Sequence, residues 1–265
     1  MHQPENTELY SKREENKAKR DLKKFSMHDY FRKLNEEFST SFQIVLDTNI
    51  CFNSNSSGLV GLLMRESFQD SINTLISQND SYIERMTKIL NKNPNIITNE
   101  IIIKELNSNL TNWRSLLSKK ERFASSPEIR DLISNFIQDH LGKLKNISDL
   151  LYERERKIST IVKNLNHYYN FTNLLKDLIK QCDVEENDKE TFLFAATASL
   201  NYPTKLLSLD KDMVILYDNL NNSLDLINET LPKKQFYISN NQVYHSYNYV
   251  RNCDIKIHRI IFRID

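Results

Sequence analysis

The sequence predicts an α/β protein with a mainly parallel central sheet covered by helices. Short apolar, β-branched runs at residues 41–46, 95–98 and 205–209 alternate with long segments of helical periodicity. Only 3 glycines and 5 prolines occur in 265 residues, which favours long helices over glycine-dependent turns. We expect the remaining segments to form a long helical insertion and two terminal extensions.

Composition excludes several classes of function. The net charge is +1, so no strong overall field points to nucleic acid or membrane, and no glycine-rich phosphate loop is present. Cys51, Cys182 and Cys253 are far apart and form no C-x-x-C pair, which favours a reducing cytoplasm over a disulfide framework or zinc ribbon. The N-terminus lacks the apolar region of a secretion signal, and no run of about 18 apolar residues predicts a membrane span.

The first half of the chain contains two predicted strands. Residues 1–40 are polar with mixed charge, and we expect a partly disordered helical arm able to hold a partner. A strand over 41–46 is followed by helical spacing over 59–90, which Pro94 ends. After the strand at 95–98, Asn99 is the expected N-cap of a helix with Glu100 in its first turn.

The second half begins with a helical block. Ser126-Pro127 predicts a capped helix start, and apolar stripes continue to about residue 180, so residues 115–182 read as an inserted hairpin or lid that could contact a protein partner. Asn187 is the expected N-cap of a helix rich in small residues, and a strand over 205–209 and a helix or turn near 213–226 follow. Alternating β-branched and aromatic residues near the end predict one or two late strands.

These elements divide the chain into three parts. We expect a polar arm over residues 1–40 and an α/β domain over 41–228 that includes the insertion at about 115–182. A β-rich extension over 229–265 completes the chain.

Acidic residues follow the predicted strands. Asp47 and Asp210 come directly after the first and third strands, Glu105 lies on the helix after the second, and Asp188 lies on the helix that leads to the third. Ligands of parallel sheets bind at the carboxyl ends of strands, so these four acids are expected to converge there. Converging carboxylates raise one another's pKa unless a cation neutralises them, and an all-oxygen set suits Mg²⁺ or Mn²⁺. The pattern therefore predicts a metal-dependent phosphoryl-transfer site.

Four segments carry a resemblance to a known family. They are VLDTNI at 45–50, IITNEIIIKEL at 96–106, NDKETFLFAATASL at 187–200 and LLSLDKDM at 206–213. In these segments the sequence resembles the PIN-domain (PilT N-terminus-like) nucleases over residues 42–215. The resemblance implies a three-layer α/β/α sandwich and metal-dependent cleavage of RNA at an acidic Mg²⁺ or Mn²⁺ site.

The resemblance also implies roles for single residues. Asp47 would be the central metal ligand, Glu105 the second acid and Asp210 the fourth. Asn49 would hold the turn after the first strand and contact a metal-bound water. Ser208 would be a supporting hydroxyl and Asp212 a candidate for the surrounding shell.

The third acid departs from the family's pattern. Strict spacing places it at Thr191, which is not an acid, whereas Asp188 lies one turn earlier on the same face and Glu190 is adjacent. Glu190 would also fit the third position of a capping box begun by Asn187. Asp188 is therefore preferred, with Glu190 as the alternative.

The substrate is expected to be RNA, and other functions stay open. The basic candidates for a substrate channel are Lys104, Arg114, Lys119, Lys120, Arg122 and Lys211. One alternative is a weak or inactive PIN-like scaffold that binds protein or RNA through the insertion or the N-terminal arm. Another is a DNA-directed, structure-specific nuclease. A haloacid-dehalogenase-like phosphatase is disfavoured because it needs an Asp at position 49, and the histidines show no ligand spacing.

Overall fold

The central sheet of the computed structural model is mixed and five-stranded, in the order β2-β1-β3-β5-β4. The structure describes residues 32, 34–38, 41–52, 54–66, 72–162, 169–231, 234–248 and 253–265. The strands are β1 (Gln43–Leu46), β2 (Ile96–Ile97), β3 (Thr204–Ser208), β4 (Phe236–Asn248) and β5 (Cys253–Ile264). All three predicted internal strands are present, and so are two late ones.

Strand pairing differs from the mainly parallel sheet that the alternation predicted. β1 pairs in parallel with both β2 and β3, whereas β5 runs antiparallel to β3 and to β4. Every residue of β3 is buried, so its second edge needs a hydrogen-bonding neighbour, and β5 supplies it. The segment expected as a separate C-terminal extension thus continues the central sheet.

Eleven helical elements connect the described strands. In chain order they are α2 (Thr48–Phe52), α3 (Ser54–Arg65), α4 (Ile72–Lys92), α5 (Glu100–Arg122), α6 (Pro127–Asn135), the π-helical turn η1 (Phe136–His140), α7 (Leu141–Val162), α8 (Tyr169–Lys180), α9 (Glu186–Ala198), α10 (Asp212–Asn221) and α11 (Leu224–Glu229). The helical spacing over 59–90 belongs to two helices, because Glu66 adopts a left-handed φ of 50° directly after α3.

Two predicted helix starts are confirmed by their capping geometry. The side chain of Asn99 accepts a hydrogen bond from Ile102 N, and α5 begins at the next residue, Glu100. Ser126 accepts from Ile129 N, with Pro127 at the first helical position of α6.

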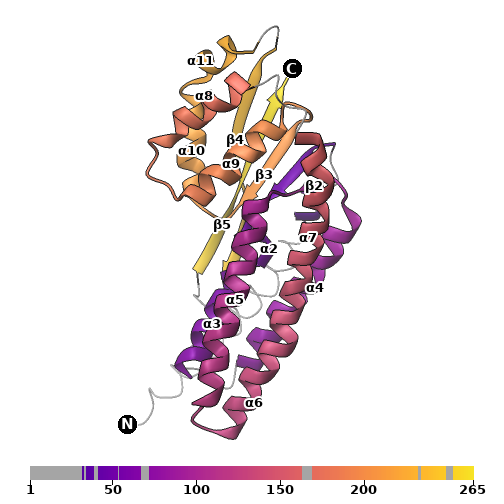
Figure 1. The fold of residues 1–265 in the computed structure, drawn as a ribbon, viewed down its shortest axis with the longest axis vertical. Helices are drawn as coiled ribbons and strands as arrows, with labels where there is room; N and C mark the ends of the chain where they lie inside the picture. Colours follow the sequence, from indigo (N-terminus) through magenta and orange to yellow (C-terminus); the bar gives the residue numbers. More distant parts are fainter. Residues whose placement is uncertain are drawn as a thin grey trace, which may run out of the picture.

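The predicted helical insertion is divided between two regions. Helices α4, α5, α6 and α7 form a long bundle that extends away from the sheet (Figure 1). Helix α8, the last part of the block, packs instead with α9, α10 and α11 near β4, where Phe171 meets Phe236 edge to face at 5.5 Å. The block is therefore not one independent hairpin.

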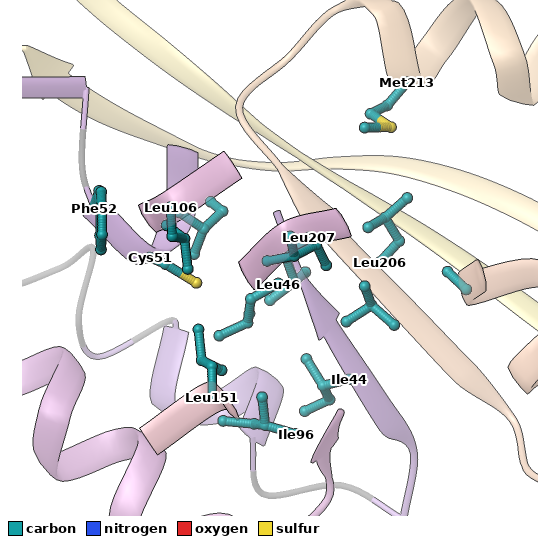
Figure 2. Packing of buried hydrophobic residues seen from close by; sticks show 14 of the residues in the cluster. Ile44, Leu46, Cys51, Phe52, Ile96, Leu106, Leu151, Leu206, Leu207 and Met213 are labelled. Carbon is teal, nitrogen blue, oxygen red and sulfur yellow. The ribbon is translucent and has the colours of Figure 1, made fainter. Parts of the chain in front are cut away.

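The core joins the strands to the helices around them. Ile44 and Leu46 of β1 lie beside Leu206 and Leu207 of β3, with Leu106 of α5 close by (Figure 2). These side chains are at most 2% exposed. Their burial fixes the position of the strand ends from which the site is built.

The end of the predicted polar arm also belongs to the core. Residues 34–38 are helical, and Leu34 and Phe38, one turn apart, are buried. Glu37 in the same turn forms a buried ion pair with Lys205 of β3 and a partly buried one with Arg259 of β5. Residues 1–31 lie outside the described part of the chain.

Candidate metal centre

Asp47 lies where the neighbouring parallel strands β1 and β3 end. It follows β1 directly, is 2% exposed, and its backbone N–H donates to Leu207 O of β3 at 3.0 Å. Its carboxylate accepts from Thr48 N at 2.7 Å through Oδ1, and from the Ser208 hydroxyl through Oδ2. Two neighbouring donors therefore hold this carboxylate in one orientation.

Thr48, the first residue of α2, links Asp47 to Glu105. Its Oγ1 donates to Glu105 Oε1 at 2.9 Å and lies 3.3 Å from Asp47 Oδ1. A threonine hydroxyl carries one proton, so the shorter contact to Glu105 is the better hydrogen bond. Thr48 was not among the residues predicted for the site, although it stands between Asp47 and Asn49 in the sequence.

The turn after β3 is held by residues of both strands. Ser208 Oγ accepts from Asp210 N at 2.9 Å, and Asn49 Oδ1 accepts from Leu209 N at 3.1 Å. Asn49 was expected to hold the turn of its own strand, but it holds the turn that carries Asp210. Ser208, expected as a supporting hydroxyl, contacts both Asp47 and the backbone N–H of Asp210.

Three aspartates converge at this turn. One carboxylate oxygen from each of Asp188, Asp210 and Asp212 lies within 4.8 Å of the others, and all three side chains are half-buried. Asp210 Oδ1 also accepts from Asp212 N at 3.0 Å, which sets the two side by side. Asp212, expected only in the surrounding shell, thus stands among the converging acids. We refer to Asp47, Glu105, Asp188, Asp210 and Asp212 as the acidic site.

Asp188 and Glu190 occupy different surroundings on α9. Asp188 lies in the first turn and faces Asp210 and Asp212. Glu190 instead lies 3.6 Å from Lys176 of α8. The expected capping box is absent because α9 begins at Glu186 with Glu185 at its N-cap, so Asn187 is inside the helix. Thr191, where strict family spacing puts the third acid, is 2% exposed.

Burial and repulsion between carboxylates raise the pKa values of Asp188 and Asp47. Burial first, and then the charges of Asp47, Asp210, Glu105 and Asp212, raise the pKa of Asp188 to about 7. Burial likewise raises the pKa of Asp47, although hydrogen bonds from Ser208 and Thr48 oppose it. A carboxylate with a raised pKa is one whose charge the folded protein does not compensate.

The pKa values of Glu105 and Asp212 are also raised, in part by two acids outside the acidic site. The pKa of Glu105 is raised by burial and by Asp47, Glu185 and Asp210, while the hydrogen bond from Thr48 opposes the rise. Burial and the charges of Asp210, Glu185 and Asp183 raise the pKa of Asp212. Glu185 and Asp183 were not predicted, and the run DVEEND at 183–188 was the signal for them.

The donor set fits a hard divalent cation. The side chains offer only carboxylate oxygens, which Mg²⁺ and Mn²⁺ prefer. Within the described ranges, no lysine, arginine or histidine forms an ion pair with any acid of the acidic site. Buried Cys51 is no alternative reactive group, because burial and the charges of Asp47 and Glu105 raise the pKa of its thiol.

The predicted basic residues do not gather at the acidic site. Lys104 pairs with Glu100 at 2.7 Å, and Lys120 pairs with Glu66 at 2.7 Å. Lys119 is 14 residues beyond Glu105 on the same helix, about 21 Å along its axis. Arg114 and Arg122 also follow Glu105 along α5. Lys211, between Asp210 and Asp212, and Lys104, next to Glu105, adjoin acids of the site along the chain, and both side chains are exposed.

Comparisons with known proteins add no functional assignment. Among the described residues, no helix combines the length and apolarity needed to cross a membrane. Searches against protein-family models, curated proteins and solved structures gave no match.

Proposed function

We propose that the protein is a metal-dependent nuclease that hydrolyses phosphodiester bonds of RNA at the acidic site. The observation that carries this proposal is the convergence of Asp188, Asp210 and Asp212 beside Asp47 and Glu105, without a compensating cationic side chain in the described part of the chain. Clustered carboxylates cost stability unless an ion neutralises them, so a divalent cation explains why they lie together.

The ion would be Mg²⁺ or Mn²⁺, held by Asp188, Asp210 and Asp212 with Asp47 adjacent. When bound, such an ion acidifies a water and stabilises charge on a phosphoryl group. The protein's own contribution is to fix the carboxylates. Ser208 and Thr48 orient Asp47, and Thr48 also holds Glu105. Asn49 fixes the turn that positions Asp210. Pre-set ligands of this kind lower the reorganisation that catalysis requires.

The finer features of the resemblance belong to the same proposal. The order of the acid-bearing segments along the chain supports a PIN-like, three-layer α/β/α arrangement, with β4 and β5 as an addition to the parallel strands. The free thiols of Cys51 and Cys182 support a cytoplasmic location.

The test is Mn²⁺-dependent cleavage of labelled RNA by wild-type protein, Asp47→Asn and Asp210→Asn. Glu190→Gln is the matched control, because it removes a carboxylate from α9 that pairs with Lys176 outside the acidic site. We expect cleavage by wild type and Glu190→Gln, loss in both aspartate variants, and none in EDTA.

Other outcomes separate the alternatives. Cleavage of branched or single-stranded DNA but not of RNA would assign the site to a DNA-directed nuclease. RNA binding without cleavage of either polymer, across several sequences and with either metal, would favour a non-catalytic PIN-like scaffold.

A further inference from the structure

A cleft lined by cations lies between α4 and the helical turn before β1. It has a volume of about 530 Å³. We call it the basic cleft, and its described lining residues are Arg32, Asn35, Arg85, Lys88, Ile89, Lys92 and Asn93. Four of them are cations, and none of the described lining residues is an acid. A volume in this range accommodates a ligand the size of a nucleotide.

The cations of α4 form a row. Arg85, Lys88 and Lys92 are all exposed and lie on one helical face, at spacings of three and four residues. They span about 10 Å of the helix axis, the distance over which one nucleic-acid strand presents roughly three phosphates. Neither Lys88 nor Lys92 forms an ion pair with any other residue that the structure describes.

Helix capping does not account for this row. Cations are favourable in the last turn of a helix, which explains Lys92 alone. The last turn of α4 already has another donor, because Asn93 N and Asn93 Nδ2 donate to Ile89 O at 3.1 Å and 2.8 Å. Lys88 lies further back along the helix, where capping gives no reason for a cation.

The basic cleft and the acidic site lie at opposite ends of the parallel strands. Asn93 precedes β2, and Ile44 N of β1 donates to Asn95 O, so the cleft is at the amino ends of these strands. The acids follow the carboxyl ends of β1 and β3. The four residues of β1 alone span about 13 Å, the length of roughly four stacked nucleotides.

We propose that the basic cleft binds the phosphate backbone of the RNA strand that the acidic site cleaves, at least about four nucleotides from the scissile bond. This rests on the proposed function. The row of cations matches the spacing of phosphates along a strand. Asn35, which is exposed, lines the same cleft and offers its side-chain amide to sugar and base edges. The concave shape favours a strand over the flat surface of a membrane.

The direct test is binding of a labelled 20-nucleotide single-stranded RNA in EDTA, followed by fluorescence anisotropy at several salt concentrations. The test variant is Lys88→Gln/Lys92→Gln. The control, Arg130→Gln/Lys180→Gln, removes two exposed charges on other helices. The loss of two phosphate contacts lowers the slope of log affinity against log salt concentration by about 1.4. If both proteins bind equally at about 1 M salt, the test variant binds roughly 25-fold more weakly at 0.1 M.

Equal binding by the test and control variants would overturn the proposal. The proposal would also be overturned if the protein bound vesicles containing phosphatidylserine through Lys88 and Lys92 but did not bind RNA. All these side chains are exposed, so circular dichroism should show unchanged folding.

Substrate length separates this proposal from the proposed function. With Mn²⁺, the test variant should cleave a 20-nucleotide RNA more slowly at low substrate concentration, but hydrolyse bis(p-nitrophenyl) phosphate as wild type does. An equal loss on both substrates would overturn binding in the cleft. If the wild type hydrolyses neither substrate, the nuclease proposal fails, whereas the anisotropy result still decides whether the cleft binds RNA.

Discussion

Replacing Asp188 by asparagine should stabilise the metal-free protein at pH 8. The pKa of Asp188 is raised from 3.8 to about 7 in the folded state. Below about pH 4 the carboxyl is protonated in both the folded and unfolded states. Between pH 4 and 7 the unfolded chain releases the proton while the folded chain keeps it, so the free energy of unfolding falls as pH rises. Because asparagine has no such proton to release, the free energy of unfolding of the variant does not fall in this way.

The magnitude follows from the shift. A shift of about three units corresponds to at most about 4 kcal/mol above pH 7. Asp188 is only half-buried, and screening by water reduces the figure to about 2 kcal/mol. Loss of a carboxylate from the first turn of α9 costs about 0.5 kcal/mol. The net gain of about 1.5 kcal/mol is roughly 3 °C in Tm.

The assay is thermal unfolding in EDTA at pH 5 and pH 8, repeated with Mn²⁺. Glu190→Gln is the control and should stay within about 0.5 kcal/mol of wild type. Mn²⁺ at 100 times its Kd should stabilise wild type by about 2.7 kcal/mol and Asp188→Asn by much less. The reasoning is refuted if Asp188→Asn is less stable than wild type at pH 8 without metal, or if Mn²⁺ stabilises both equally.

Three further predictions concern the support of the site and the core. Thr48→Val removes the hydroxyl that donates to Glu105 and should weaken Mn²⁺ affinity or activity about 10- to 100-fold, while Thr48→Ser retains both; equal Mn²⁺ titrations of the two variants would contradict this. His140→Phe takes one hydrogen-bonding partner from both Asn79 and Asp80 inside the bundle, and urea denaturation should show a loss of about 1–3 kcal/mol. Leu207→Ala should cost about 2–5 kcal/mol, against less than about 0.5 kcal/mol for the exposed Leu226→Ala, and similar urea midpoints would contradict the assigned core.

Local signals in the sequence were sufficient to predict many of the helices and strands. The caps Asn99 and Ser126 are confirmed because each depends on a side chain and a backbone N–H three residues apart. Pairing between distant segments has no comparable local signal. The apolar alternation around Ile257 and Ile261 predicted a strand, but nothing in it specified β3 as the antiparallel neighbour. The mixed sheet therefore became evident only from the structure.

The candidate site was predictable to the extent that its residues adjoin strands. Asp47 and Asp210 follow buried strands, so the sequence predicted their positions. Asp212 lies among the other acids because Asn49 and Ser208 hold the turn after β3. The Asn49 contact to this turn joins residues that are 160 positions apart in the sequence. The Thr48 link to Glu105 spans 57 residues and has no local signature.

The position of the acids is set by the core rather than by a metal. β1 and β3 pair so that Leu46 lies opposite Leu207, and the next residues along the two strands, Asp47 and Ser208, meet at the same edge. A slip of one residue would turn the buried side chains of either strand to the opposite face, so core packing specifies this register strongly. β5 holds the other edge of β3, with His258 opposite Ser208. The repulsion among the carboxylates is therefore resisted by a sheet paired on both sides, which explains how the acids can stay together before any cation binds.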